Sequence, residues 1–353
     1  MAINSERGQG RAAHGIRVVA IGGGTGLSTL LKGLKRYTVP NEAPSTPTSI
    51  SDLTAVVTVS DDGGSSGRLR RELNMLPPGD VRNCLVALSE DENLLSKLFQ
   101  HRFSSSGELE GHSFGNLFLA ALTAMSGDFA VAVKKASEIL ATRGHILPAT
   151  SANVELEAIM NDGSRVRGET KITASEKRVV ELTMVPAHPE PLPQALEAIA
   201  AADIITIGPG SLFTSLIPNL LVHGIPQAIA ASNAVKVFIC NLMTEANESL
   251  HMSASEHLKA LDAHASGHAL FTYALVNSAP VSAQMRERYA EERAEPVECD
   301  CPQVEALGVK CIAGNFLEER DVVRHDTDRL CRELLRLAKT SLPGTRIAQA
   351  ALR

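Results

Sequence analysis

Two glycine-rich segments have the composition of loops that bind phosphate groups. Gly22-Gly23-Gly24-Thr25-Gly26 follows a short β-branched run, and Gly208-Pro209-Gly210-Ser211 follows the apolar run 204–207. Glycine lets backbone N–H groups approach an anion, and a helix that begins after such a loop adds a partial positive charge. The two segments therefore predict a ligand that carries phosphate.

The first loop does not fix the class of nucleotide. A dinucleotide fingerprint needs glycine at its first, third and sixth positions, and the sixth residue counted from Gly22 is Leu27. The loop also lacks the Gly-Lys-Ser/Thr ending of a P-loop. An NAD-dependent oxidoreductase is therefore disfavoured, and a tight strand-to-helix turn without a ligand is the structural alternative.

Asp61 and Asp62 are adjacent carboxylates in a loop, residues 60–67, whose other residues are all glycine or serine. Such a pair can bind a hard cation such as Mg²⁺ through few protein ligands. It can equally accept hydrogen bonds from ribose or sugar hydroxyls, or form only a solvated turn. We take both residues as candidate metal ligands and candidate catalytic residues.

Other polar residues are candidates because of where they fall. Arg82 lies in the first turn of an expected helix, where the helix dipole disfavours a cation. His112 and Asn116 are four residues apart, which predicts one shared helix face. For His112, a capping or core histidine is the alternative. Asn241 and Thr244 follow the expected strand 235–240.

Two candidates near the C-terminus have the chemistry of a nucleotide contact. Tyr289 could stack on a base, although a position on a helix surface is the alternative. Arg324 is a donor of the type that binds phosphate. It precedes the last expected helix, 328–338, for which Asp326 or Thr327 would be the N-cap.

Strands and helices alternate along most of the chain. Ile16–Ile21 is an expected strand, and the spacing of Leu27, Leu30, Leu31 and Leu34 predicts a helix after it. Further strands are expected at 54–59, 204–207, 235–240 and 271–276, and further helices at 80–99, 114–125, 129–140, 195–202 and 212–221. This order predicts a Rossmann-like three-layer α/β/α fold with a mostly parallel sheet. In such sheets, ligands bind beyond the carboxyl ends of the strands.

A single α/β domain is expected over residues 16–340, between loose tails at 1–15 and 341–353. Apolar and acidic residues alternate over 154–158, and Asn161-Asp162-Gly163 can form a hairpin turn. Residues 150–186 are therefore expected to be a small antiparallel β insertion. The apolar faces of 94–99 and 114–125 are expected to be core, with a homo-oligomer interface as the alternative.

Composition excludes several classes of protein. The chain has 353 residues, a formal net charge of −6, 3% aromatic residues and no Trp, which argues against a nucleic-acid-binding surface. No apolar run of about 18 residues is present, so no membrane span is expected. The six cysteines do not suggest a disulfide framework, and a reducing cytoplasm is the expected compartment.

The cysteines divide into two groups. Cys84, Cys240 and Cys331 lie in apolar-periodic segments and are expected to be buried as small hydrophobic side chains. Cys299, Cys301 and Cys311 are closer together, but they form a poor zinc pattern without a nearby fourth ligand.

Taken together, the motifs resemble those of the YvcK-type gluconeogenesis-factor family. The motifs that carry the resemblance are residues 21–26, 60–70, 78–83, 111–116, 207–212 and 324–327, in the family's order within about 16–340. The family is related to the 2-phospho-L-lactate transferases, which have a Rossmann-like body, use a guanine-nucleotide donor and need Mg²⁺.

The resemblance implies a cytoplasmic bacterial protein needed for growth on gluconeogenic carbon sources and for cell shape. It also implies binding of a UDP-sugar, notably UDP-N-acetylglucosamine. Carried over by motif, residues 23–26 would contact the nucleotide phosphates and Asp62 would lie near an acceptor or metal. Arg324 and Tyr289 would bind the UDP-sugar. Thr327 matches a position that could be a regulatory phosphorylation site in some relatives, with a helix cap as the alternative.

Two functions remain after these observations. The favoured one is a nucleotide-sugar sensor, not an enzyme, whose occupancy is read by a partner protein. The alternative is a Mg²⁺-dependent phosphotransfer enzyme similar to 2-phospho-L-lactate transferase. In that case Asp61 or Asp62 would hold the metal, and Arg82 or His112 would stabilise developing charge. The sequence contains no familiar nucleophile motif, which favours the sensor.

Overall fold

The computed structural model describes residues 15–39, 49–90, 94–104 and 107–341. Apart from Gly15 and Ser341, the two predicted tails lie outside the described residues.

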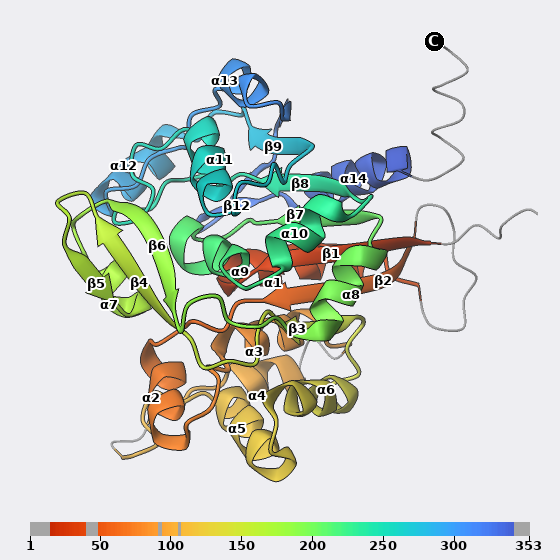
Figure 1. Ribbon diagram of the computed structural model, residues 1–353, viewed down its shortest axis with the longest axis vertical. Coiled ribbons are helices and arrows are strands. Elements are labelled where there is room, and N and C mark those ends of the chain that lie inside the picture. Colours follow the sequence, from red (N-terminus) through yellow and green to blue (C-terminus); the bar gives the residue numbers. More distant parts are fainter. Residues whose placement is uncertain (1–14, 40–48, 91–93, 105–106, 342–353) are drawn as a thin grey trace, which may run out of the picture.

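A seven-stranded parallel sheet forms the centre of the molecule (Figure 1). Its strand order is β10-β9-β8-β7-β1-β2-β3, and every neighbouring pair is parallel. The central strands are buried on both faces, which explains their β-branched sequences. The strands are β1 (Ile16–Gly22), β2 (Ile50–Val57), β3 (His145–Pro148), β7 (Ile204–Ile207), β8 (Val235–Ile239), β9 (Tyr273–Asn277) and β10 (Lys310–Gly314).

Helices cover both faces of this sheet, so the predicted three-layer α/β/α fold is confirmed (Figure 1). On one face α1 (Gly24–Lys35) packs against α3 (Gly79–Leu88) and α14 (Thr327–Ala338). On the other, α8 (Pro193–Ala201) packs against α10 (Ile225–Ala231). The four leucines whose spacing predicted α1 are all buried.

Most of the remaining helices gather at the two ends of the sheet (Figure 1). Near β3 lie α2 (Gly64–Leu73), α4 (Leu94–Gln100), α5 (Phe114–Ser126) and α6 (Phe129–Ile139). Near β9 and β10 lie α11 (Ala254–Ala263), α12 (Ala283–Glu291) and α13 (Cys301–Ala306). Phe99 of α4 is buried against Phe114 and Phe118 of α5, as expected of a core face, whereas Leu94, Leu98 and Met125 on the same two helices are exposed.

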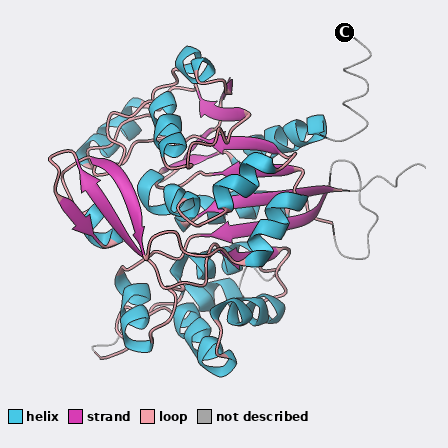
Figure 2. Cartoon of the chain, in the orientation of Figure 1, coloured by secondary structure: helices cyan, strands magenta, loops and turns pink. Residues whose placement is uncertain are grey.

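The antiparallel insertion predicted at 150–186 is a three-stranded sheet beside the main sheet (Figure 2). It comprises β4 (Glu155–Met160), β5 (Arg165–Arg167) and β6 (Val179–Val185), with α7 (Glu169–Thr173) between β5 and β6. A second hairpin, β11 (Leu317–Glu319) with β12 (Val323–His325), was not predicted. Its strands have three residues each, half of them charged, so they are too short to show the apolar alternation by which strands are found.

Several predicted boundaries were wrong. The strand expected at 54–59 begins at Ile50 and ends at Val57, because the polar residues Ser51 and Asp52 also lie along β1. The helix expected at 212–221 begins as a π-helical turn, Leu212–Leu216, and continues as α9 (Ile217–Leu220). The amide of Leu216 donates to the carbonyl of Ser211, five residues back.

The cysteine predictions had mixed outcomes. Cys84, Cys240 and Cys331 are buried, as expected. Cys301 and Cys311 are joined by a disulfide, which the sequence analysis did not expect. The two cysteines are ten positions apart in the sequence, but the turn from α13 into β10 brings their Cα atoms within 5.4 Å of each other.

Within the described ranges, no single helix is long and apolar enough to cross a membrane. One bent pair, Leu212–Leu220 with Ile225–Ala231, meets the length and composition criteria jointly, at an angle of 74°.

The loops after β1 and β7 touch each other backbone to backbone. A Cβ atom added at Gly26 would lie 2.7 Å from the carbonyl carbon of Pro209 and 3.0 Å from the amide nitrogen of Gly210. Only glycine therefore allows these two loops to approach so closely.

We predict that Gly26→Ala lowers the free energy of unfolding by about 1–3 kcal/mol, because the added methyl group must push the two backbones apart. Urea denaturation measures this change. Gly107→Ala is the control: a Cβ there meets open space, and its effect should stay within about 0.5 kcal/mol. Equal effects of the two substitutions would contradict the contact.

His325 joins the β11–β12 hairpin to the main sheet. Its Nε2 lies 3.1 Å from the carbonyl oxygen of Cys240, at the end of β8. Burial of the ring lowers the pKa of His325 to about 4, against an ordinary value of 6.5, although the hydrogen bond opposes the shift. The imidazole is therefore neutral at pH 7 and donates to the carbonyl.

We predict that the free energy of unfolding decreases as the pH falls from 6.5 toward 4, in part because of His325. The unfolded chain takes up a proton near pH 6.5, whereas the folded chain does so only near pH 4, so acid favours unfolding. His325→Gln stays neutral throughout and should lose less stability over this range. Denaturation of both proteins at pH 7.5 and 4.5 measures the difference, and parallel pH curves would refute it.

Candidate functional site

A cavity of about 420 Å³ opens beyond the carboxyl ends of β1, β7 and β8. The chain leaves β1 toward β2 on one side, while β7 adjoins β1 on the other, so this is the point at which strand order reverses. Open parallel sheets bind their ligands at such points.

Most of the predicted ligand-binding residues line this one cavity. They come from loops that are far apart in the sequence: Gly23, Gly24, Thr25, Gly26, Pro209, Gly210, Ser211, Asn241, Thr244, Tyr289 and Arg324. Gly22 and Gly208 are not part of the lining and instead set the strand ends beneath it. A Cβ atom at Gly208, whose φ is +91°, would lie 2.6 Å from the carbonyl oxygen of Ile239.

The glycine loop after β1 is the N-terminus of a helix that has no side-chain cap. Gly23 is the N-cap of α1, and the first turn contains no acidic residue. Gly24 has φ of +61°, which glycine adopts without strain. Thr25 and Gly26, in the first turn, line the cavity. Backbone N–H groups and the helix dipole therefore favour an anion here.

Asn241 holds the second glycine loop in place. Its side-chain oxygen accepts from the Gly210 amide at 3.1 Å, and its side-chain nitrogen donates to the Gly210 carbonyl at 2.9 Å. Because the side-chain amide of Asn241 binds both the N–H and the C=O of Gly210, Asn241 orders the loop that a phosphate would contact.

Two glutamates that the sequence analysis missed accept hydrogen bonds from this loop and the residues after it, and one of them, Glu245, also lines the cavity. Ser211 donates to Glu245 at 3.0 Å, while Glu248 accepts from the Phe213 amide and the Thr214 hydroxyl at 3.0 and 2.9 Å. Burial, and then the nearby Glu245, raise the pKa of Glu248 to about 7. In the sequence, Glu245 and Glu248 follow soon after the candidates Asn241 and Thr244, and this proximity could have identified them.

The opposite wall combines an aromatic ring with a cation. Tyr289 packs beside Leu242 and Val323, and its hydroxyl accepts from the Val323 amide at 3.1 Å. Arg324 lies on β12 and is exposed. No residue in the described ranges forms a hydrogen bond or an ion pair with its guanidinium group. This wall can contact a planar ring and an anionic group side by side.

A second cavity, of about 280 Å³, holds another set of predicted residues. Asp61, Arg82 and Asn116 line it, together with Asp80 and Arg102. Arg82 is 8% exposed and donates to Ser113 at 2.7 Å, to Asn116 at 3.2 Å and to Asn83 at 2.8 Å. These bonds fix the guanidinium group of Arg82, which was expected to be a poor fit for the first turn of a helix.

His112 and Asn116 do not share a helix face, which corrects the prediction. Ser113 is the N-cap of α5, so His112 precedes the helix. Both side chains instead meet at Ser65: His112 Nδ1 lies 2.9 Å from its hydroxyl, and Asn116 donates to it at 3.0 Å. Burial lowers the pKa of His112. His112 lines neither of the two cavities and positions Ser65.

Asp80 connects the two cavities. Asp80 lies in the first turn of α3, whose N-cap is Pro78. The Gly24 amide of the first cavity donates to its carboxylate, and Asp80 also lines the second cavity. Burial, followed by the charge of Asp61, raises the pKa of Asp80 to about 6.

Asp61 and Asp62 point to different partners. Asp62 accepts from the amide and the hydroxyl of Thr170, at 2.8 and 2.5 Å, and so holds α7 of the antiparallel insertion. Asp61 accepts from the Gly63 amide at 2.8 Å and lines the second cavity. Neither lines the first cavity.

Glu169 of α7 adds another carboxyl group to this region. Burial, then Asp61 and Asp80, raise the pKa of Glu169 to about 9. Mutual repulsion of this kind is relieved by a cation. Mg²⁺ is usually held by one or two carboxylates, several waters and substrate phosphates. The donor set therefore fits Mg²⁺, although no three of these carboxyl oxygens lie within 4.8 Å of one another in the described residues.

The chain is similar to proteins that are named gluconeogenesis factors. The gluconeogenesis factor of Halalkalibacterium halodurans is 48% identical over 319 residues, which cover 90% of this chain and 95% of that protein. The gluconeogenesis factor of Bacillus subtilis is 45% identical over 324 residues, covering 92% and 98%.

A solved structure and a family model agree with these relatives. The crystal structure of a UPF0052-family protein from Bacillus halodurans has a TM-score of 0.85 and 47% identity, and the match covers 91% of this chain and 99% of that one. The family model of 2-phospho-L-lactate transferase CofD matches residues 18–317. The chain therefore belongs to the CofD family, within the group whose relatives are named gluconeogenesis factors.

Proposed function

We propose that this protein binds a nucleoside diphosphate sugar of the UDP-N-acetylglucosamine type in the 420 Å³ cavity. The observation that carries the proposal is the convergence of two glycine-rich loops, an aromatic ring and an exposed arginine on that one cavity. Its volume lies in the ordinary range for small-molecule sites.

Each part of the cavity matches one part of such a ligand. The diphosphate would lie against the first turn of α1 and the loop ordered by Asn241, because N–H groups and the helix dipole favour anions there. Arg324 would pair with the diphosphate, and the Tyr289 ring would pack against the base. Glu245 and Glu248, behind the second loop, would accept from its donors and keep it rigid.

We further propose a regulatory role in cytoplasmic metabolism. Relatives that match over most of their length are named gluconeogenesis factors, which supports a need for this protein on gluconeogenic carbon sources. A role in cell shape would follow from sensing a precursor sugar of the cell wall. A partner protein would read the occupied state, and the cavity itself would need no reaction.

We predict that Arg324→Ala weakens binding of UDP-N-acetylglucosamine by about tenfold or more, because a hydrogen bond between charged groups is lost. Binding of uridine, which lacks phosphate, should change little. Isothermal titration calorimetry measures both ligands.

The matched control is Arg320→Ala. Arg320 is also an exposed arginine of the β11–β12 hairpin, but it pairs with Glu318 and lies outside the cavity. Wild-type affinity is expected for this variant. The proposal fails if the wild-type protein shows no saturable binding below millimolar concentration, or if the two variants weaken binding equally.

A second candidate function is Mg²⁺-dependent phosphoryl transfer, as the CofD family match suggests. The specific observation in its favour is the second cavity, where Arg82 and Arg102 accompany Asp61 and Asp80. Mg²⁺ would supply charge neutralisation on the transferred group. Arg82, already fixed by three partners, would orient an anionic acceptor, and deprotonated Asp61 and Asp80 would hold the cation.

We predict that stabilisation by Mg²⁺ increases between pH 5 and pH 7. Asp80, whose pKa is raised to about 6, must lose its proton before it can bind a cation, so Mg²⁺ competes with protons at the lower pH. The shift in Tm on adding Mg²⁺ measures this, and Asp61→Asn should reduce it at pH 7.

Asp321→Asn, on the exposed β11–β12 turn, is the control and should leave the Tm shift unchanged. Release of nucleotide from GTP or a UDP-sugar, with candidate acceptors present, tests the reaction itself. Release at background level, insensitive to Asp61→Asn, would rule out the enzyme and leave the binding function.

A further inference from the structure

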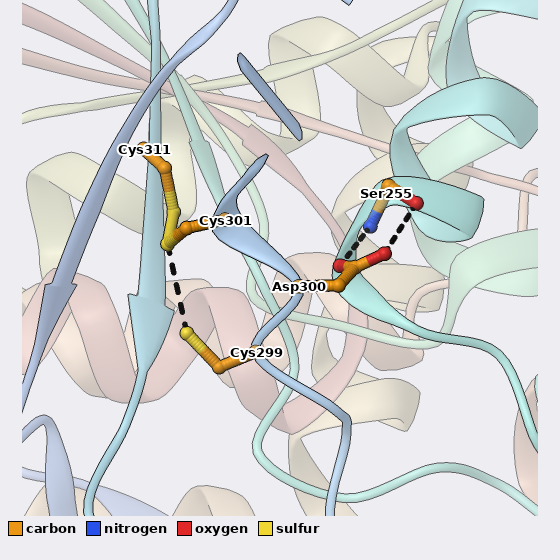
Figure 3. Close-up of a disulfide and its surroundings, with 5 residues drawn as sticks. All are labelled: Ser255, Cys299, Asp300, Cys301 and Cys311. Atoms are coloured by element: carbon orange, nitrogen blue, oxygen red, sulfur yellow. Dashed lines mark hydrogen bonds between the residues drawn. A yellow bond between two sulfur atoms is a disulfide. The ribbon is translucent and has the colours of Figure 1, made fainter. Parts of the chain in front are cut away.

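Three cysteine sulfurs gather at the β10 edge of the main sheet, in a part of the molecule that the proposed function does not use. Cys299 precedes α13, Cys301 is its first residue, and Cys311 lies on β10. All three sulfur atoms lie within 4.8 Å of one another. Cys301 and Cys311 form the disulfide, and the Cys299 sulfur faces it, 3.7 Å from that of Cys301 (Figure 3).

The backbone holds these sulfurs together independently of the disulfide. Asp300, between Cys299 and Cys301, points away from the sulfurs toward Ser255 (Figure 3). Its carboxylate accepts from the Ser255 amide at 2.9 Å, from the Ser255 hydroxyl at 2.5 Å and from the Ser253 hydroxyl at 2.7 Å. Cys311 is fixed separately, by the pairing of β10 with β9. Reduction of the disulfide would therefore leave three thiols in one place.

The segment before Cys299 is also anchored. Val297 donates to the carbonyl of Leu242 at 3.0 Å, and Thr244 donates to the carbonyl of Glu295 at 2.7 Å. Leu242 and Thr244 line the first cavity. Cys299 thus lies at the end of a segment whose residues Glu295 and Val297 are hydrogen-bonded to the cavity wall.

We propose that the reduced chain binds one thiophilic d¹⁰ cation, Zn²⁺ or Cu⁺, through Cys299, Cys301 and Cys311. Thiolates are the protein ligands that these ions prefer. All three cysteines are partly exposed, so an ion can enter from solvent. Three sulfur ligands satisfy trigonal Cu⁺, and they leave Zn²⁺ one position for water. Among the described residues, this is the one group of three metal-type side chains that lies so close together.

The disulfide and the metal-bound form exclude each other. A dithiol reductant supplies two electrons and two protons to the Cys301–Cys311 bond, which gives two thiols, and the reductant becomes a disulfide. Binding of the cation then releases the three thiol protons and forms three metal–sulfur bonds. Oxidation removes two of the three ligands, so the site is available only in a reducing compartment.

The test uses the full chain, reduced with a phosphine and then desalted without oxygen. Zn²⁺ is titrated against a chromophoric chelator, and Cu⁺ against a chelator specific for that ion, which distinguishes the two cations. We expect one equivalent of metal per chain, an ultraviolet sulfur-to-metal charge-transfer band for Cu⁺, and protection of three thiols from alkylation. The oxidised chain should bind neither ion.

Substitutions locate the site. Cys299→Ser, Cys301→Ser and Cys311→Ser should each weaken binding by more than about tenfold. Cys331→Ala removes a buried thiol elsewhere and should bind as the wild type does. Circular dichroism verifies that each variant folds. A reduced chain that binds neither cation, or that binds one equally well without Cys299, would overturn the proposal. Neither result bears on the nucleotide-sugar cavity.

Discussion

The candidate site depends on one contact, the approach of the β1 and β7 loops at Gly26 and Pro209. No side chain could stand between these backbones. Asn241 then fixes the next peptide unit, at Gly210, from the end of β8. The loops after three neighbouring strands thereby form one wall of the first cavity, and the proposed diphosphate lies against it. A wider gap would separate the two anion-binding loops.

Buried carboxyl groups give this region its second property. Asp80, Glu169 and Glu248 all have raised pKa values, because burial penalises their charge and their neighbours repel it. Asp80 lines the second cavity, and its carboxylate accepts a hydrogen bond from the amide of Gly24, which lines the first. The two proposed functions therefore use different cavities, and Asp80 is linked to both by the contacts above.

The sequence predicted the sheet and most of the first cavity, because both depend on local signals. Gly26 and Gly210 follow apolar strands directly, and parallel strands must present such loops at one edge. The sequence did not indicate that the side chains of Asp61 and Asp62 contact different partners, because Thr170, the partner of Asp62, is 108 residues away. Asp80, Glu248 and the pairing of Cys301 with Cys311 were missed for the same reason: packing between distant segments decides their surroundings.

The segment from Glu295 to Cys299 has a consequence of its own. Hydrogen bonds join Glu295 to Thr244 and Val297 to Leu242, and both Thr244 and Leu242 line the first cavity. The cysteine cluster at the edge of the sheet and the wall of the first cavity are therefore connected through one short segment of the chain.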